Sequence, residues 1–184
     1  MKKLFSTQNI ALMALFTALI AICSWISIPL GPVPFTLQTF AIFVIAGLLG
    51  TKRGLVSLAA YILLGLVGVP VFAGFKGGAS VLAGPTGGYI VGFILTVLVI
   101  GIVNDCVKLD NELVKMVVLF VSMIIGDVLC FVVGTIWFMH VAGYNLATSL
   151  SYCVIPYIIP DVAKMIVAVV IVNRVKKYVS VFDN

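Results

Sequence analysis

Long apolar runs alternate with short polar, proline-rich or glycine-rich segments along the whole chain. A membrane-spanning helix needs about 20 mostly apolar residues, because it has to cross about 30 Å of hydrocarbon. Six runs approach or reach this length, although the second is short for a full crossing. We therefore predict helices over residues 9–28, 37–50, 54–70, 87–103, 113–139 and 155–172. The first run is interpreted as a span and not as a signal peptide, because it is long and no A-x-A cleavage site follows it.

The composition supports an integral membrane protein. Of the 184 residues, 63% are hydrophobic and 9% are charged, whereas a soluble domain is about 45–50% apolar and about 25% charged. So few charged side chains cannot cover the core of a soluble domain of this length. The composition excludes a soluble enzyme, a nucleic-acid binder and a disordered chain. We predict a single all-α domain over residues 1–184, an integral membrane bundle of six transmembrane helices.

The distribution of basic residues predicts the orientation of this bundle. Basic side chains favour cytoplasmic loops, and an even number of spans places both termini on the same side. With the N-terminus inside, the cytoplasmic set is Lys2, Lys3, Lys52, Arg53, Lys108, Lys115, Arg174, Lys176 and Lys177. Lys76 is then the one basic residue outside, and Lys164 lies within the last span. The pattern predicts an N-in, C-in protein of the cell membrane, in contact with lipid.

This orientation places residues 29–36, 71–86 and 140–155 on the external face. Among these three segments, the first two carry nearly all of the proline and glycine. Irregular backbone near a membrane survives only where it is buried in protein or lines a cavity. The pattern indicates an outward-facing ligand pocket, although glycines four residues apart, such as Gly84 and Gly88, are also typical of close helix packing.

Two charged residues lie together in the last predicted span. Asp161 and Lys164 are three residues apart and therefore share one face of a helix. Each ionisable residue within a span costs about 2.5–3.5 kcal/mol on insertion scales, so such residues are functional candidates by default. One interpretation is ligand contact, and the other is an ion pair that helps the helix to insert.

Other residues have more than one interpretation. Asp127 lies in the middle of the fifth span without a cation on its own helix, so a proton relay, a ligand contact and a neutral buried acid stay open. Gln38 and Thr36 are expected to face the pocket or to cap a helix. Ala14 and Ala18 are one helical turn apart and predict close packing, inside the bundle or against a partner protein.

Residues for catalysis or metal binding are scarce. The sequence has a single histidine, His140, and four widely spaced cysteines without a C-x-x-C pair, which is typical of buried thiols and not of a metal site. Neither a G-x-S-x-G element nor an H-E-x-x-H element occurs in the chain. We predict a protein without catalytic residues, resident metal or cofactor.

Four segments of the chain resemble the BioY family. They are GPVPFTLQT at 31–39, GVPVFAG at 68–74, GPTGGY at 84–89 and PYIIPDVAK at 156–164. BioY proteins are the biotin-specific S components of energy-coupling factor (ECF) transporters. The resemblance implies a six-helix S-component fold that binds biotin at its external face. It also implies a transmembrane coupling (T) subunit and two cytoplasmic ATPase subunits as partners, whose ATP hydrolysis tilts the bundle.

The resemblance also implies roles for individual residues. Asp161 and Lys164 match the family residues that contact biotin, and Ala14 and Ala18 match the small-residue motif that docks on the coupling subunit. The external loop that ends at Tyr89 is implied to close over the ligand. The substrate-binding candidates are Asp161, Lys164, Gln38, Phe35, Gly84, Thr86, Gly88 and Tyr89.

The chemistry of biotin agrees with these candidates. Its apolar bicycle suits Phe35, Phe72 and Tyr89, and its carboxylate suits Lys164, Lys76, Gln38 or backbone amides. Alternatives are an S component for another small vitamin, a proton-coupled carrier that uses Asp127 and Asp161, and a purely structural membrane subunit.

Overall fold

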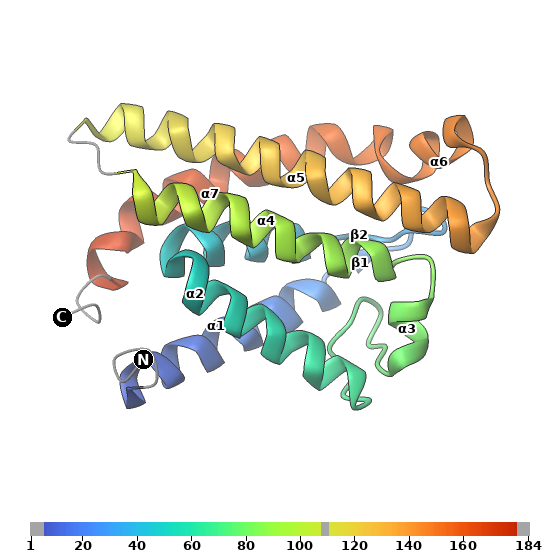
Figure 1. The fold of residues 1–184 in the computed structure, drawn as a ribbon, viewed down its shortest axis with the longest axis horizontal. Coiled ribbons are helices and arrows are strands. Elements are labelled where there is room, and N and C mark those ends of the chain that lie inside the picture. The colour runs from blue at the N-terminus through green and yellow to red at the C-terminus, as the bar shows by residue number, and fades with distance from the viewer. Residues whose placement is uncertain (1–5, 108–110, 180–184) are drawn as a thin grey trace.

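The computed structural model describes residues 6–107 and 111–179, most of which lie in α-helices (Figure 1). The helices are α1 Thr7–Trp25, α2 Gln38–Leu66, α3 Ala79–Ala83, α4 Gly87–Cys106, α5 Glu112–Ala142, α6 Leu146–Cys153 and α7 Ile158–Val179. A 3₁₀ turn, η1 Ile155–Tyr157, precedes α7. The two short strands β1 Ser27–Ile28 and β2 Phe35–Thr36 pair in antiparallel fashion.

Helix α2 contains two of the predicted spans. The helix is interrupted at Gly50, whose φ of 70° and ψ of −170° are not helical, and Figure 1 shows that the chain reverses direction there. In the described part of the chain, five helical stretches are long and apolar enough to cross a membrane. Counting the halves of α2 separately gives the six crossings that the hydropathy pattern predicts.

Gly50 makes this reversal possible for a local reason. Its left-handed φ favours glycine, and a Cβ atom there would lie 2.0 Å from Oδ1 of Asp105. The other carboxylate oxygen of Asp105 accepts the backbone N–H of Thr51 at 2.9 Å. The second half of α2 therefore begins with an N–H group that a side chain at the end of α4 satisfies.

The predicted orientation agrees with the positions of the helix ends. The start of α1, the reversal in α2, the end of α4, the start of α5 and the end of α7 gather at one end of the bundle (Figure 1). The β1–β2 pair, α3 and α6 lie at the other end. Of the predicted cytoplasmic set, Lys2, Lys3, Lys108 and the side chain of Lys177 lie outside the described residues. The others lie at the end that the charge pattern predicts to be cytoplasmic.

One external segment differs from the prediction in its secondary structure. Residues 140–155 were expected to form a loop, but they contain helix α6. Gly143, at φ 71°, ends α5, and the side chain of Asn145 accepts the N–H of Thr148 at 2.9 Å, which caps α6. The polar residues of this segment therefore separate two helices instead of forming one long loop.

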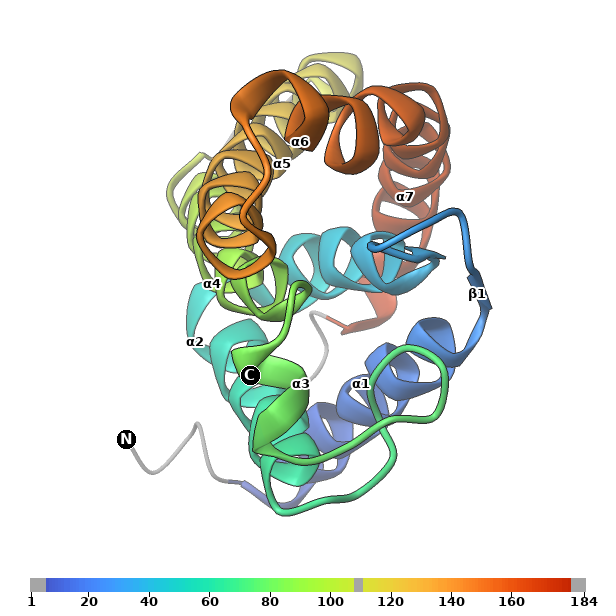
Figure 2. The same ribbon diagram turned by 90° about the vertical axis from the view of Figure 1, so that its right-hand side faces the viewer.

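The core lies around α2, which packs against α1, α4 and α7 (Figure 2). The best apolar window of α2 is 72% buried, against 28% for α5, whose remaining surface is left for lipid. Helices α4 and α5 approach closely because Gly92 and Gly134 have no side chains. A Cβ atom on Gly92 would lie within 3.0 Å of Cys130, and one on Gly134 within 2.5 Å of Tyr89. Small residues at helix contacts of this kind are typical of membrane proteins.

Candidate ligand-binding site

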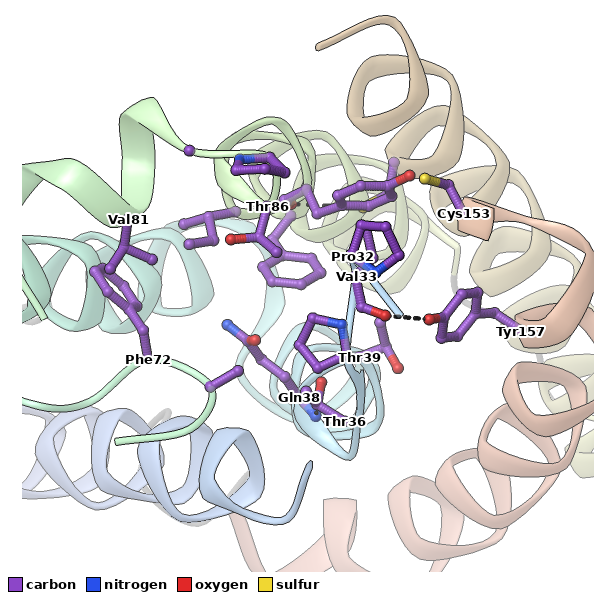
Figure 3. Close-up of a pocket in the computed structure, with 18 of the residues that line it drawn as sticks. Pro32, Val33, Thr36, Gln38, Thr39, Phe72, Val81, Thr86, Cys153 and Tyr157 are labelled. Carbon is purple, nitrogen blue, oxygen red and sulfur yellow. Dashed lines mark hydrogen bonds between the residues drawn. The ribbon is translucent and has the colours of Figure 1, made fainter. Parts of the chain in front are cut away.

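A cavity of about 450 Å³ opens at the predicted external end of the bundle. This volume lies in the range of small-molecule binding sites. The segment between β1 and β2, the start of α2 and the glycine-rich segment before α4 form one part of its wall. Helices α4, α5 and α7 form most of the rest, together with Cys153 of α6 and Tyr157 of η1 (Figure 3). Segments that are distant in sequence therefore meet around one cavity.

Lys164 is the centre of a polar cluster on the α7 side of the cavity. Its Nζ atom donates to Asp161 Oδ1 at 2.6 Å, to the Thr36 carbonyl at 2.7 Å and to Thr39 Oγ1 at 2.9 Å. The Thr39 hydroxyl in turn donates to Asp161 Oδ1 at 3.2 Å. Lys164 is 7% exposed and Asp161 is 2% exposed. A buried ion pair is tolerated when further hydrogen bonds satisfy it, and here they do.

Phe35 supports this cluster and is not part of the cavity wall. Its ring centroid lies 4.2 Å from the Lys164 ammonium, which is cation–π distance. The same ring stacks on Tyr157 with a centroid distance of 6.4 Å. Phe35 was expected to contact ligand directly; the structure places it outside the residues that line the cavity, with its ring against Lys164 and Tyr157.

Tyr157 fixes the proline-rich segment over the cavity. Its hydroxyl donates to the carbonyl of Val33, a bond that joins η1 to the β1–β2 connection (Figure 3). Pro32, Val33 and Pro34 line the cavity beside it. The prolines restrict the backbone of this segment, and the Tyr157 bond ties it to the last span.

Gln38, the first residue of α2, also lines the cavity. It is buried, and its Nε2 atom donates to the Tyr61 hydroxyl at 2.8 Å. The ring of Phe72 packs edge-on against Tyr61 at 5.4 Å and also lines the cavity. The remaining amide N–H and carbonyl oxygen of Gln38 have no other bond within residues 6–107 and 111–179, so they are available to a ligand.

The glycine-rich segment meets the cavity at some of the predicted positions. Gly84, Thr86 and Tyr89 lie in the wall, and Lys76 lines the cavity as an exposed residue. Gly88 does not: it is buried between helices, where a Cβ atom would lie 2.2 Å from Cβ of Trp137. Helix packing is therefore the role of Gly88 in this structure.

Asp127 enters the cavity from α5. It is 5% exposed and belongs to the same cavity wall as Asp161 and Lys164. Its carboxyl group has no hydrogen-bonding partner in the part of the chain that the structure describes. That distinguishes it from every other acidic group around the cavity.

Ala14 and Ala18 lie far from this site, on the outer face of α1. Both are exposed, while the α1 residues Met13, Thr17 and Ile20 are buried against the bundle. The sequence left open whether these alanines pack inside the bundle or against a partner protein. Their exposed positions do not fit packing inside the bundle.

Several wall residues were not predicted. Thr39, Tyr157, Cys130, Cys153 and Phe93 all line the cavity or complete its hydrogen bonds. Thr39 follows Thr36 by three residues and is also polar, which was an available signal. The two cysteines were interpreted as ordinary buried thiols. Both are buried and free, but periodicity cannot separate a buried face from a cavity face.

Family comparison agrees with this geometry. A model described as the BioY family matches residues 1–181 of the chain. The biotin transporter BioY of Thermotoga maritima is 43% identical over 163 residues, which cover 89% of this chain and 92% of the relative. The probable biotin transporter BioY of Pyrococcus horikoshii is 36% identical over 169 residues, covering 92% of this chain and 96% of the relative.

A solved structure has the same fold. It is the crystal structure of the S-component for biotin from an ECF-type ABC transporter, which is 34% identical to this chain. The match has a TM-score of 0.82 and covers 92% of this chain and 91% of that one. The arrangement of helices around the cavity is therefore shared with a known S component.

Proposed function

The chain belongs to the BioY family, and we propose that it is the biotin-binding S component of an ECF-type ABC transporter in the cell membrane. It is a transport protein and not an enzyme, and biotin is its ligand and not a cofactor. The observation that carries the ligand assignment is the external cavity with its buried Asp161–Lys164 pair, in a chain whose relatives are named for biotin.

The cavity suits the two ends of biotin. The apolar bicycle requires apolar walls, which Phe72, Tyr89 and Phe93 provide. The ureido group has two N–H donors and a carbonyl acceptor, and the valerate chain ends in a carboxylate. Lys76, an exposed residue of the wall, supplies the positive charge that a carboxylate needs, and the Thr86 hydroxyl supplies a donor.

Lys164 has a particular place in this scheme. An ammonium group has three N–H donors, and protein acceptors occupy all three in this structure. For Lys164 to contact biotin, the ligand has to replace one of these acceptors. Otherwise, Lys164 holds Asp161 in place and the ligand meets the second oxygen of that aspartate.

Transport needs partners that this chain does not contain. The bundle carries no nucleotide-binding motif, so we propose that a transmembrane T subunit and two cytoplasmic ATPases supply the energy. The exposed Ala14 and Ala18 provide a strip of small apolar residues on α1 that allows close approach of another membrane helix. We propose that the T subunit docks on this strip.

Binding and coupling are tested separately. Isothermal titration calorimetry of the detergent-purified chain is expected to show saturable biotin binding, and a panel of other small vitamins is expected to compete poorly. Absence of saturable binding overturns the proposal. Co-purification with a T subunit and ATPases, and uptake that requires ATP and not a pH gradient, separate the ECF mechanism from a proton-coupled carrier.

A further inference from the structure

Asp127 is a buried acid that the assignments above leave without a role. It lies on α5, is 5% exposed and borders the cavity. A buried carboxylate is costly unless hydrogen bonds or a counter-charge compensate it. Yet no side-chain or backbone group in the described residues donates a hydrogen bond to Asp127.

The potential donors near Asp127 have other partners. The Thr96 hydroxyl donates to the Gly126 carbonyl at 2.9 Å. The Cys130 thiol donates to the Tyr89 carbonyl at 3.6 Å, and the Tyr89 hydroxyl pairs with Thr135 at 3.4 Å. The packing of α4 against α5 therefore satisfies its own polar groups and leaves the Asp127 carboxyl facing the cavity.

The contrast with Asp161 narrows the role further. Oδ1 of Asp161 accepts from both Lys164 and Thr39, and Lys164 has its full set of acceptors. Asp127 receives no such bonds, so both of its oxygens are available as acceptors. A ligand that offers N–H donors therefore has unoccupied acceptors at Asp127, in addition to the second oxygen of Asp161.

The need for a donor also limits which end of a ligand Asp127 faces. The ionised valerate end of biotin has no hydrogen to donate, whereas the ureido ring carries two N–H donors. A net hydrogen bond contributes about 0.5–1.5 kcal/mol, which is about 2- to 10-fold in affinity.

From this geometry we infer that Asp127 accepts a hydrogen bond from a ureido N–H of the ligand and thereby selects for a cyclic urea. The inference rests on the proposed function, because it takes biotin as the ligand. It adds a specificity-determining residue on α5 to the α7 pair, so that acidic groups from two helices face the cavity.

The test combines substitutions of Asp127 with ligand analogues. Affinities are measured calorimetrically for the full chain, for Asp127→Ala and for Asp127→Asn with biotin, biotin methyl ester and the two mono-N-methylated ureido derivatives of biotin. Asp127→Ala, which removes both acceptor oxygens, is expected to weaken biotin and the methyl ester by the same factor, about 2- to 10-fold, and Asp127→Asn, which keeps one carbonyl acceptor, is expected to weaken both by less. For the derivative that lacks the contacted N–H, either substitution is expected to cause no further loss.

The matched control is Asp105→Asn, an acid-to-amide change at the cytoplasmic end of α4. An asparagine still accepts the Thr51 N–H through its carbonyl oxygen, so biotin affinity is expected to stay at the wild-type value. Ligand-free Asp127→Asn is expected to melt at the same temperature as wild type or higher, since it removes an unpaired buried acid. Asp127→Ala is measured in the same way, so that the result does not depend on one variant.

Three results overturn the inference. One is wild-type biotin affinity in both Asp127 variants, and another is an equal loss for every analogue, which indicates a structural role. The third is absence of biotin binding to the wild-type chain, which overturns the proposed function as well. Biotin binding by the wild type together with unchanged Asp127 variants overturns this inference alone.

Discussion

The inner face of α7 and the outer face of α1 use opposite kinds of surface. On α7, Asp161 and Lys164 are charged, buried and hydrogen-bonded to residues of another helix. On α1, Ala14 and Ala18 are small, apolar and exposed. The first surface is specific because its polar groups have defined partners, and the second is suited to docking because its two alanines are small. Binding and coupling should therefore be separable by mutation.

The largest effect is expected from Lys164→Ala. It removes the donor shared by Asp161, Thr36 and Thr39, and breaking a buried ion pair costs about 3–5 kcal/mol. We expect biotin affinity to fall by at least about 100-fold and thermal stability to fall with it, as measured by calorimetry and thermal melting. Lys115→Ala, at an exposed lysine of the cytoplasmic end, should change neither.

The double variant Asp161→Asn, Lys164→Met separates binding from stability. With both charges removed, no buried charge is left unpaired, so most of the lost stability should return. Biotin affinity should stay low. Recovery of biotin affinity together with stability would show that the Asp161–Lys164 ion pair helps the helix to insert and does not contact the ligand.

Replacing Ala14 and Ala18 by tryptophan tests the other surface. Two bulky side chains should prevent close approach of a partner helix, so we expect biotin uptake in cells to be lost while the affinity of the purified protein is unchanged. Ile136→Trp is the control, because Ile136 is 63% exposed on the lipid-facing side of α5. Intact uptake by the alanine variants would remove the docking role from α1.

A third region, far from both surfaces, provides a reference. Gly50→Ala places a Cβ in a left-handed conformation against Asp105, which costs about 1–2 kcal/mol of strain and about 1 kcal/mol for the displaced cap. Gly143→Ala has a similar φ of 71° but no atom within 4 Å of the added Cβ, so only the strain is expected. Thermal melting should rank the two variants, and biotin affinity should change in neither.

Among the variants expected to weaken biotin binding, Tyr157→Phe should have the smallest effect on affinity. The change deletes the hydroxyl that reaches the Val33 carbonyl and keeps the ring that stacks on Phe35. An unsatisfied buried carbonyl costs about 1–3 kcal/mol, so we expect a lower melting temperature and a loss of affinity of less than about tenfold. A loss as large as that of Lys164→Ala would mean that Tyr157 contacts the ligand itself.

The hydropathy pattern by itself determined the architecture. Runs of apolar residues must be helical in lipid, because each backbone polar group needs a partner inside its own segment. The short second run is helical in the structure. This helix ends at Gly50, where the chain reverses direction. The same logic singled out Asp161 and Lys164, because two charges inside a span are costly enough to stand out from sequence alone.

The tertiary structure decided which residues share the cavity and which of them are already satisfied. Nothing in the sequence distinguishes Gly84, in the cavity wall, from Gly88, which packs against Trp137. Phe35, whose ring contacts Lys164 and Tyr157, lies in a two-residue strand that is too short to predict from the sequence. Whether Asp127 has a partner depends on donors from α4 and α7, and side chains on different helices meet only through packing, which a linear pattern does not record.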